Sequence, residues 1–227
     1  MQFLADTFSL EVIEKLAHQA AISGATSNTA IAAKEGIANY FDAAESLAEI
    51  AHQLDVSISP PALDTPEALL KGALILRSIG PFRIKIPITT SAGTPTHDVI
   101  MRLRGLQVPI NITAVLDAGQ LHSSMLEDLQ PSETILVSVF AGRCRDIGRN
   151  PSEVIRQVRS EHPRSVKTIW ASTRDLQSIV EAESACSDYV TARPELLLRR
   201  IGPPQSLDET TQDVLREFQA AADKMGY

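Results

Sequence analysis

Short β-branched or apolar segments alternate with amphipathic helical patterns along this chain of 227 residues. Eight of these segments read as buried strands, at 3–6, 22–26, 54–59, 82–87, 108–113, 134–140, 166–172 and 189–192. Helical patterns, several opened by Ser, Thr or Pro, lie between them at 9–20, 65–80, 96–105, 116–128, 151–162 and 173–184. Eight alternations predict an α/β protein built as a closed parallel (β/α)8 TIM barrel.

An open, doubly wound sheet is the alternative architecture. Its first turn usually carries a glycine-rich phosphate loop, but the ADTFSL turn at 5–10 contains no glycine. A chain of this length, with 44% hydrophobic residues, suits one large core. We therefore expect a single barrel domain over residues 1–204.

A further helix follows the GPPQS segment at 202–206, outside the eight units. Its amphipathic pattern covers 207–225, within a C-terminal segment that we bound at 205–227. The apolar face of this helix comprises Val214, Leu215, Phe218 and Ala222. Such a face must pack against the barrel or against a neighbouring subunit.

The charge distribution excludes several classes of partner. The net charge is -7, and no run of Lys and Arg interleaved with aromatic residues occurs, so we expect neither a nucleic acid nor a membrane partner. The first residues lack the basic and long apolar regions of an export signal. Cys144 and Cys186 have no metal-ligand spacing and form no disulfide framework. We expect a soluble, cytoplasmic protein with free thiols.

A lysine interrupts the apolar segment FRIKIPITT at 82–90. Lys85 must lose its hydration there unless its amine reaches a polar cavity or gives up its proton. In an edge strand it would simply face water, but a closed barrel has no edge. The other strand lysine, Lys167, lies at the amino end of its strand, the end associated with stability.

Lys85 is therefore the candidate amine nucleophile, reacting with a carbonyl carbon to form a Schiff base. Such a lysine needs a nearby acid/base, and Asp6 is the carboxylate at a strand end. Ligands collect at the carboxyl ends of barrel strands. The other polar residues expected at this mouth are Thr26, Asn28, Ser59, Asn111, Thr113, Arg143, Ser172 and Arg174.

Six segments of the chain resemble, in order and separation, the small-subunit transaldolases and fructose-6-phosphate aldolase-like proteins. They are FLADTFSLEVIEKL, SGATSNTAIAAKEG, IKIPITT, VPINITAVLDAGQ, VSVFAGRCRDIG and WASTRD, from residue 3 to about residue 192. The most specific pieces are the TxN after the second strand, the KIP(I/V)T strand and the FxGRxxD segment. Each is weak alone, and together they are strong.

The resemblance implies a role for each polar residue at the mouth. Lys85 forms the Schiff base with a ketose donor, and Asp6 acts as acid/base in carbon–carbon cleavage. The residues implied to contact the donor or a catalytic water are Asn28, Asn111, Thr26 and Thr113. Arg143, Ser172 and Arg174 match the phosphate pocket of the family.

Other interpretations of these residues remain open from the sequence. Asn28 could simply cap the helix that follows it, and Thr113 could be a core hydroxyl. Arg143 and Arg174 could be arginines of surface loops.

The chain also departs from the family at two positions, and a third separates the two branches of the family. Ser59 stands where the third strand usually ends in Glu or Gln, and Thr29 replaces the usual proline. Phe140 is the residue of transaldolases at a position where the aldolase branch has Tyr. This difference favours transfer over release.

We therefore expect a transaldolase that moves a dihydroxyacetone unit from a ketose phosphate to an aldose phosphate, without metal or organic cofactor. Its place would be the pentose phosphate pathway or the synthesis of a secondary-metabolite sugar. An aldolase that releases dihydroxyacetone is the first alternative. The second is a catalytically impaired barrel that only binds sugar phosphates. The resemblance also implies a homo-oligomer, a pentamer or decamer, in which the C-terminal helix crosses to a neighbour.

Overall fold

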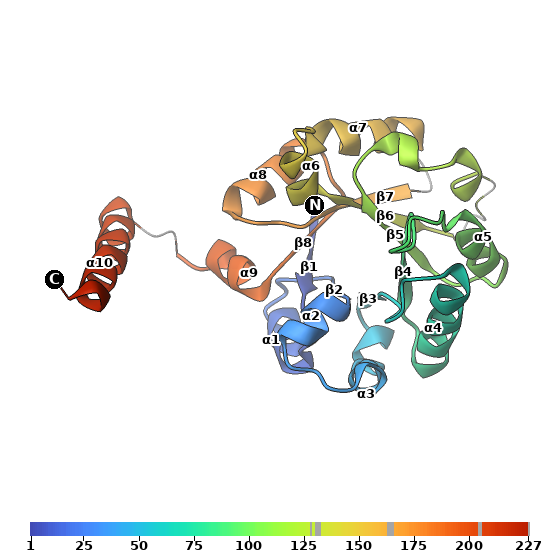
Figure 1. Cartoon of the computed structure of the whole chain (residues 1–227), viewed down its shortest axis with the longest axis horizontal. Helices are drawn as coiled ribbons and strands as arrows, with labels where there is room; N and C mark the ends of the chain where they lie inside the picture. Colours follow the sequence, from blue (N-terminus) through green and yellow to red (C-terminus); the bar gives the residue numbers. More distant parts are fainter. Residues whose placement is uncertain (128, 130–132, 163–165, 204–205, 227) are drawn as a thin grey trace.

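The computed structural model describes residues 1–127, 129, 133–162, 166–203 and 206–226. Eight parallel strands close into a barrel in which sequence neighbours pair, from β1 round to β8 and back to β1 (Figure 1). They are β1 (Gln2–Asp6), β2 (Gly24–Ser27), β3 (Asp55–Ile58), β4 (Arg83–Pro87), β5 (Ile110–Val115), β6 (Ile135–Phe140), β7 (Val166–Ala171) and β8 (Tyr189–Ala192). The predicted (β/α)8 barrel is confirmed.

Helices surround the barrel, and polar caps begin most of them. They are α1 (Leu10–His18), α2 (Thr29–Lys34), α3 (Tyr40–Ser46), α4 (Pro66–Ile79), α5 (His97–Gly105), α6 (Ala141–Asp146), α7 (Pro151–Glu161), α8 (Leu176–Ser184), α9 (Pro194–Ile201) and α10 (Leu207–Met225), with a 3-10 turn η1 (Ile50–His52). Thr65 caps α4 by accepting from the backbone N–H of Ala68, and Pro66 fills the first helical position.

The apolar residues form two cores, one outside the barrel strands and one in the barrel interior. Outward residues such as Ile84 and Ile86 join the large core between strands and helices. The smaller core fills the interior with Leu4, Leu136, Ile169 and Ala171. Because side chains alternate along a strand, Arg83 and Lys85 of β4 both point inward. The interior is thus apolar in the middle and polar at both ends.

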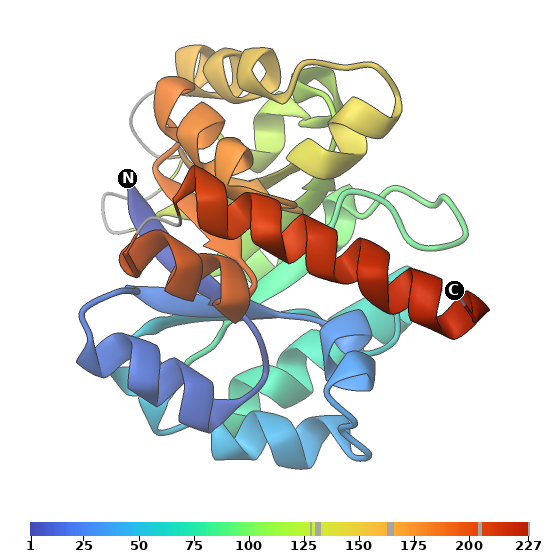
Figure 2. The ribbon, with the colours of Figure 1, turned by 90° about the vertical axis from the view of Figure 1, so that its left-hand side faces the viewer.

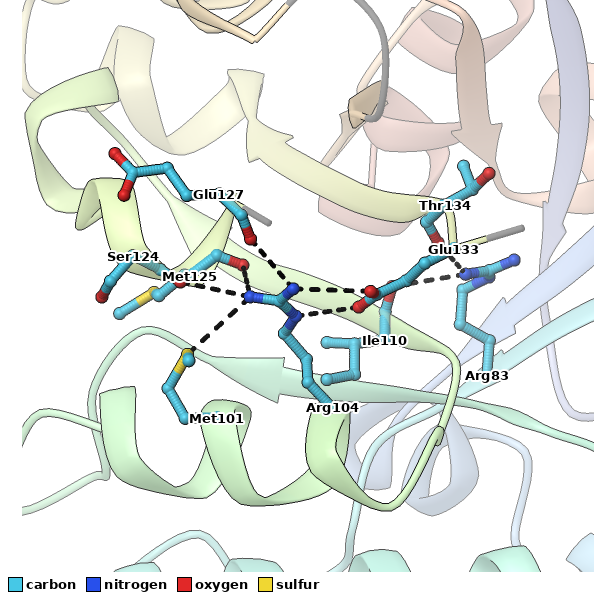
Figure 3. Close-up of polar contacts among 9 residues, drawn as sticks. All are labelled: Arg83, Met101, Arg104, Ile110, Ser124, Met125, Glu127, Glu133 and Thr134. Atoms are coloured by element: carbon cyan, nitrogen blue, oxygen red, sulfur yellow. Dashed lines mark hydrogen bonds and ion pairs between the residues drawn. The ribbon is translucent and has the colours of Figure 1, made fainter. Parts of the chain in front are cut away.

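The amino-terminal end of the barrel, which we call the floor, is closed by arginine contacts (Figure 3). Arg83 binds Asp55 through two nitrogens and also donates to the carbonyl of Thr134 at 2.8 Å. Arg104, near the end of α5, donates to Glu133 at 2.8 Å and to the carbonyls of Ser124, Met125 and Glu127 at 3.0–3.1 Å. These contacts tie the connection between β5 and β6 to α5.

The helix predicted over 116–128 is wrong. The structure has two 3-10 turns there, η2 (Ala118–Gln120) and η3 (Ser123–Met125), and residue 128 lies outside the described residues. The side chain of Asp117 caps the first turn, and Gln120 Oε1 accepts from the backbone N–H groups of Leu116 and Asp117. Side chains therefore satisfy backbone donors locally, in competition with a continuous helix.

Three helices were not among those predicted, namely α3, α6 and α9, whereas α2 is the helix that Asn28 was expected to cap. Each of the three has six to eight residues, too few for a clear period of 3.6. One of them matters for the mouth of the barrel, because α6 follows β6 directly, as α2 follows β2.

The predicted C-terminal helix is confirmed as α10, over the same residues 207–225. It projects away from the barrel beside α9 (Figure 1), and seen from that side it is one long helix (Figure 2). Its apolar residues stay exposed, with Phe218 at 65% and Leu215 at 57%. The predicted domain boundary, at residues 204–205, lies outside the described residues. No helix in the described part of the chain is long and apolar enough to cross a membrane.

Candidate active site

Lys85 and Asp6 face each other inside the carboxyl-terminal end of the barrel, which we call the mouth. Lys85 is only 4% exposed, and its charge interacts with that of Asp6. Burial lowers the pKa of the Lys85 amine, and the nearby Asp6 carboxylate only partly opposes this. Burial also raises the pKa of Asp6, against the opposing effect of Lys85. Both groups are thus shifted toward their neutral forms.

Further contacts define the charge environment of Asp6. The hydroxyl of Thr26, its neighbour on β2, donates to Asp6 Oδ1 at 2.8 Å. Glu35, which follows α2, raises the pKa of Asp6 further, and Lys34 lowers it. Glu35 itself accepts from the Thr7 hydroxyl at 2.6 Å and from the backbone N–H of Phe8 at 2.9 Å.

Two predicted polar residues of β5 lie inside the barrel with unused hydrogen-bonding atoms. Asn111 pairs in register with Lys85, and its Oδ1 accepts from the Ser138 hydroxyl at 2.8 Å. Within the described part of the chain, Asn111 Nδ2 and Thr113 Oγ1 are buried without a partner. Because unpaired buried polar atoms are costly, a water or a substrate hydroxyl is their expected partner.

Two buried serines, rather than one, belong to the end of β3. Ser57 pairs in register with Thr26, and its buried hydroxyl has no partner among the described residues. Ser59 follows the strand, is also buried, and its carbonyl accepts from the Tyr40 hydroxyl at 2.7 Å. Neither position carries a carboxylate, and the predicted departure from the family at Ser59 stays a prediction.

The three residues predicted to bind phosphate lie together. Asp146 Oδ2 lies 2.6 Å from Arg174 Nη2 and 3.4 Å from Arg143 Nη1, so the two guanidiniums share one carboxylate oxygen. These arginines hold the pKa of Asp146 below its usual range. A Cβ on Gly142 would meet Ser172 Oγ at 2.8 Å and Arg174 Nε at 2.7 Å. Only glycine at 142 therefore lets α6 begin this close to both residues.

Two other predicted residues are placed less decisively. Asn28 caps α2, with its Oδ1 accepting from the backbone N–H groups of Ala30 and Ile31 at 2.9 and 3.1 Å. The capping role is therefore real, and its amide nitrogen remains the atom that could face a ligand. Phe140 packs against the inner core at the end of β6.

A cavity of about 740 Å³ lies at the mouth, and Asp6, Lys34, Arg174 and Arg193 are among the residues that line it. Lys85 is not one of its lining residues, so the cavity reaches the proposed nucleophile only through its neighbour Asp6. Among the described residues, no group of three or more His, Cys, Asp or Glu side chains could hold a metal ion.

Sequence reasoning missed five polar residues of the mouth: Ser57, Ser138, Thr191, Glu35 and Asp146. The first three are inward residues one or two positions before a strand end, and alternation along each strand would have found them. Glu35 follows the short helix α2, and Asp146 is the aspartate of the FxGRxxD segment, to which the sequence assigned no role of its own.

The family model described as Transaldolase/Fructose-6-phosphate aldolase matches residues 3–226. A protein named "Probable transaldolase" from Halalkalibacterium halodurans is 31% identical, over 96% of this chain and 99% of that protein. A protein of the same name from Exiguobacterium sp. is 25% identical, over 99% of this chain and 100% of the relative.

Solved structures support the fold alone, because their sequence identities are low. N-acetylneuraminate lyase from Mycoplasma synoviae superposes with a TM-score of 0.54 at 8% identity, covering 98% of this chain and 80% of that one. The Amycolatopsis orientalis BexX/CysO complex contains a chain with a TM-score of 0.55 at 16% identity, covering 91% of this chain and 93% of that one.

Proposed function

Since the chain belongs to the transaldolase/fructose-6-phosphate aldolase family, we propose that it transfers a dihydroxyacetone unit between sugar phosphates through a Schiff base on Lys85. The observation that carries this proposal is a buried lysine whose charge interacts with a half-buried carboxylate at the mouth of a barrel. A lysine whose pKa is lowered supplies the neutral amine that attacks a carbonyl.

The proposed reaction uses Lys85 as nucleophile and Asp6 as acid/base. Lys85 Nζ attacks the ketone carbon of the donor, and loss of water gives a protonated imine. Asp6 then takes the proton of the hydroxyl on the second carbon from the imine carbon. The bond between that carbon and the one next to the imine breaks, and the electron pair of this bond passes to the imine, which becomes an enamine. The aldose phosphate leaves. The enamine then adds to the carbonyl of an acceptor aldehyde, in the reverse of these steps. Hydrolysis of the resulting imine releases the product ketose and free Lys85.

The buried polar atoms around Lys85 are suited to hold the donor and the water. Thr113 Oγ1 and Ser57 Oγ are buried hydroxyls without partners among the described residues, and either can bind a water that relays protons to the imine. Asn111 Nδ2 can donate to a donor hydroxyl. In this proposal Thr26 orients Asp6, and Asn28 contributes its amide nitrogen to the donor.

The arginine pair is suited to the phosphate at the far end of the sugar. Arg143 and Arg174 are already held side by side by Asp146, next to Ser172. Two guanidiniums and a hydroxyl match the oxygens of a phosphate group. Arg174 and Asp6 line the same cavity, and in this proposal the sugar occupies it.

Release of dihydroxyacetone is the competing outcome, and Phe140 is the residue that bears on it. The aromatic ring of Phe140 offers no proton to the enamine, whereas the tyrosine of the aldolase branch would. We therefore expect Phe140→Tyr to raise the rate of dihydroxyacetone release from fructose 6-phosphate relative to transfer. An unchanged ratio in the variant would remove Phe140 as the determinant.

A catalytically impaired barrel that only binds sugar phosphates is favoured by one observation, the lack of a carboxylate at Ser57 and Ser59. If those serines only slow proton relay, Ser59→Glu should raise kcat on transaldolase substrates. Should the folded Ser59→Glu protein lose activity instead, the serine serves a different substrate, and a specialised sugar becomes the better assignment.

The direct test of the proposed function is an assay of transfer from fructose 6-phosphate to erythrose, ribose and glyceraldehyde phosphates. We expect a new ketose phosphate with at least one acceptor. Binding without product from any acceptor, and without dihydroxyacetone release, would support the binding barrel instead.

A cytoplasmic protein that assembles into pentamers or decamers through the exposed apolar face of α10 is part of the same proposal. Removal of residues after 204 should then give smaller species by light scattering.

A further inference from the structure

Three side chains from neighbouring strands form a hydrogen-bonded chain that ends on Asp6. Thr191 Oγ1, on β8, lies 2.5 Å from Thr26 Oγ1, on β2, and Thr26 Oγ1 lies 2.8 Å from Asp6 Oδ1. Both threonines are buried, at 4% and 0% exposure. β1 lies between β8 and β2, so the contact between the threonines is made across the barrel interior.

Counting protons gives this chain a direction. The Thr26 hydroxyl has one proton, and it donates that proton to ionised Asp6. The 2.5 Å contact then requires Thr191 to be the donor, because two lone pairs would otherwise face each other. When Asp6 is protonated, the chain can run the other way, from Asp6 to Thr26 to Thr191.

We propose that Thr191 is a positioning residue that acts through Thr26 to set the charge state of Asp6. A hydroxyl that accepts a hydrogen bond becomes a stronger donor, so Thr191 strengthens the bond from Thr26 to the carboxylate. This proposal rests on the proposed function for its catalytic meaning, because Asp6 is the acid/base there.

Thr191 differs from the other groups around Asp6 in how it acts on the carboxylate. Lys85 on β4, and Lys34 and Glu35 at the end of α2, act on Asp6 through charge. Thr191 carries no charge and acts only through a hydroxyl contact. The backbone of Thr191 is itself held, since the Thr173 hydroxyl donates to its carbonyl at 2.8 Å.

The test is the titration of the Asp6 side-chain carboxyl carbon, followed by NMR in protein with labelled aspartate and assigned with Asp6→Asn. Loss of the Thr191 hydroxyl removes more support from the ionised form of Asp6 than from the neutral form. We expect Thr191→Val, which keeps the shape of the side chain, to raise the midpoint by about half a pH unit. Thr191→Ser keeps the hydroxyl and should leave the midpoint where it is in the native protein.

Two further comparisons separate action through Thr26 from a packing role. Thr26→Val should raise the midpoint more than Thr191→Val, and adding Thr191→Val to Thr26→Val should raise it no further. The acid limb of the kcat/KM profile should move with the carboxyl titration. If Thr191→Val does not fold, Thr191→Ala takes its place, with the same expectation.

An unshifted midpoint in the folded valine or alanine variant would overturn the proposal. So would a shift of equal size in the Thr26→Val background, because Thr191 would then act by another route. The titration does not depend on catalysis. Absence of any product or imine in the native protein would therefore refute the proposed function and leave the Thr191 measurement intact.

Discussion

Two cations of one strand, Arg83 and Lys85, differ in their hydrogen bonding at the two ends of the barrel. Both belong to β4 and both point inward. At the floor, Arg83 binds Asp55 through Nε and Nη2, and its third nitrogen reaches backbone carbonyls (Figure 3 shows the contact with Thr134). At the mouth, Lys85 makes no hydrogen bond to any residue that the structure describes, and Asp6 is its electrostatic partner.

The surroundings of the two cations differ in the same way. Around Arg83 the floor adds Arg104, whose nitrogens bind Glu133 and three carbonyls. Around Lys85 the mouth contains buried polar atoms of Ser57, Asn111 and Thr113 that have no partner in the described residues. Satisfied polar groups stabilise a fold, whereas unsatisfied ones cost stability and remain free to bind a ligand. The comparison assigns stability to the floor and chemistry to the mouth.

The largest expected effect is on catalysis at the mouth. Lys85→Met keeps the length of the side chain but removes the amine, so the rate of sugar transfer should fall by about 10⁴-fold or more. Lys167→Met, which removes an exposed strand lysine from β7, is the matched control and should keep nearly full activity. Initial rates with fructose 6-phosphate as donor measure both. Comparable losses of activity in the two variants would contradict the assignment of the chemistry to Lys85 at the mouth.

The next effect is on stability at the floor. Asp55→Ala leaves the Arg83 guanidinium, 15% exposed, without its carboxylate. We expect the free energy of unfolding to fall by about 2–3 kcal/mol, less than for a fully buried pair because Asp55 is 31% exposed. Urea unfolding measures this, with the exposed Asp64→Ala as control. A stable Asp55→Ala protein would show that the floor does not depend on this ion pair.

A smaller effect should distinguish substrates at the mouth. Arg174→Ala removes one guanidinium of the proposed phosphate pocket, so KM should rise by about tenfold for phosphorylated sugars. For unphosphorylated sugars KM should change little, because they leave the pocket empty. Steady-state kinetics with both kinds of sugar give the comparison. Equal losses would assign Arg174 a structural role through its bond to Asp146.

The smallest effect is a pH dependence of stability caused by Lys85. Its pKa in the folded protein is lowered from the ordinary value of 10.5, so the unfolded chain binds the proton more tightly. The cost of burying Lys85 is therefore full below the folded pKa and disappears as pH rises toward 10.5. We expect Lys85→Met to be more stable than the native protein at pH 7 and to lose this advantage near pH 10.

Urea unfolding across this pH range measures the difference between the two proteins. Lys167→Met again serves as control, since an exposed lysine should give no such trend. An advantage of Lys85→Met that is constant with pH would mean that packing, and not protonation, is responsible.

The sequence predicted the mouth well where one rule applied. Polar residues at strand ends converge in a parallel barrel, and Lys85, Asn111 and Thr113 are buried there. Asp6 is half-buried and close enough to Lys85 for their charges to interact. Residues whose place depends on the alignment of neighbouring strands were harder to predict. Ser57 pairs with Thr26 and was not predicted, because a sequence does not show where neighbouring strands align.

Short-range side-chain contacts explain the remaining differences. The helix predicted over 116–128 broke into turns because Asp117 and Gln120 satisfy local backbone groups. Asp146 lies three residues after Arg143 in the FxGRxxD segment, but its bond to Arg174 could not be predicted, since Arg174 comes from the segment after β7. The apolar face of α10 was predicted, and its residues Leu215 and Phe218 are exposed in the structure, so what covers this face stays a prediction.

Trapping the imine tests the central claim, that Lys85 is the reactive amine, most directly. The native protein is incubated with fructose 6-phosphate and borohydride, which reduces an imine to a stable amine. Because trypsin does not cleave after a modified lysine, a reduced adduct on Lys85 would appear on the peptide 84–102, whereas unmodified protein yields 86–102. The account predicts the mass of a reduced sugar adduct on 84–102 and on no other lysine peptide. An adduct on another lysine, or none at all, would contradict it.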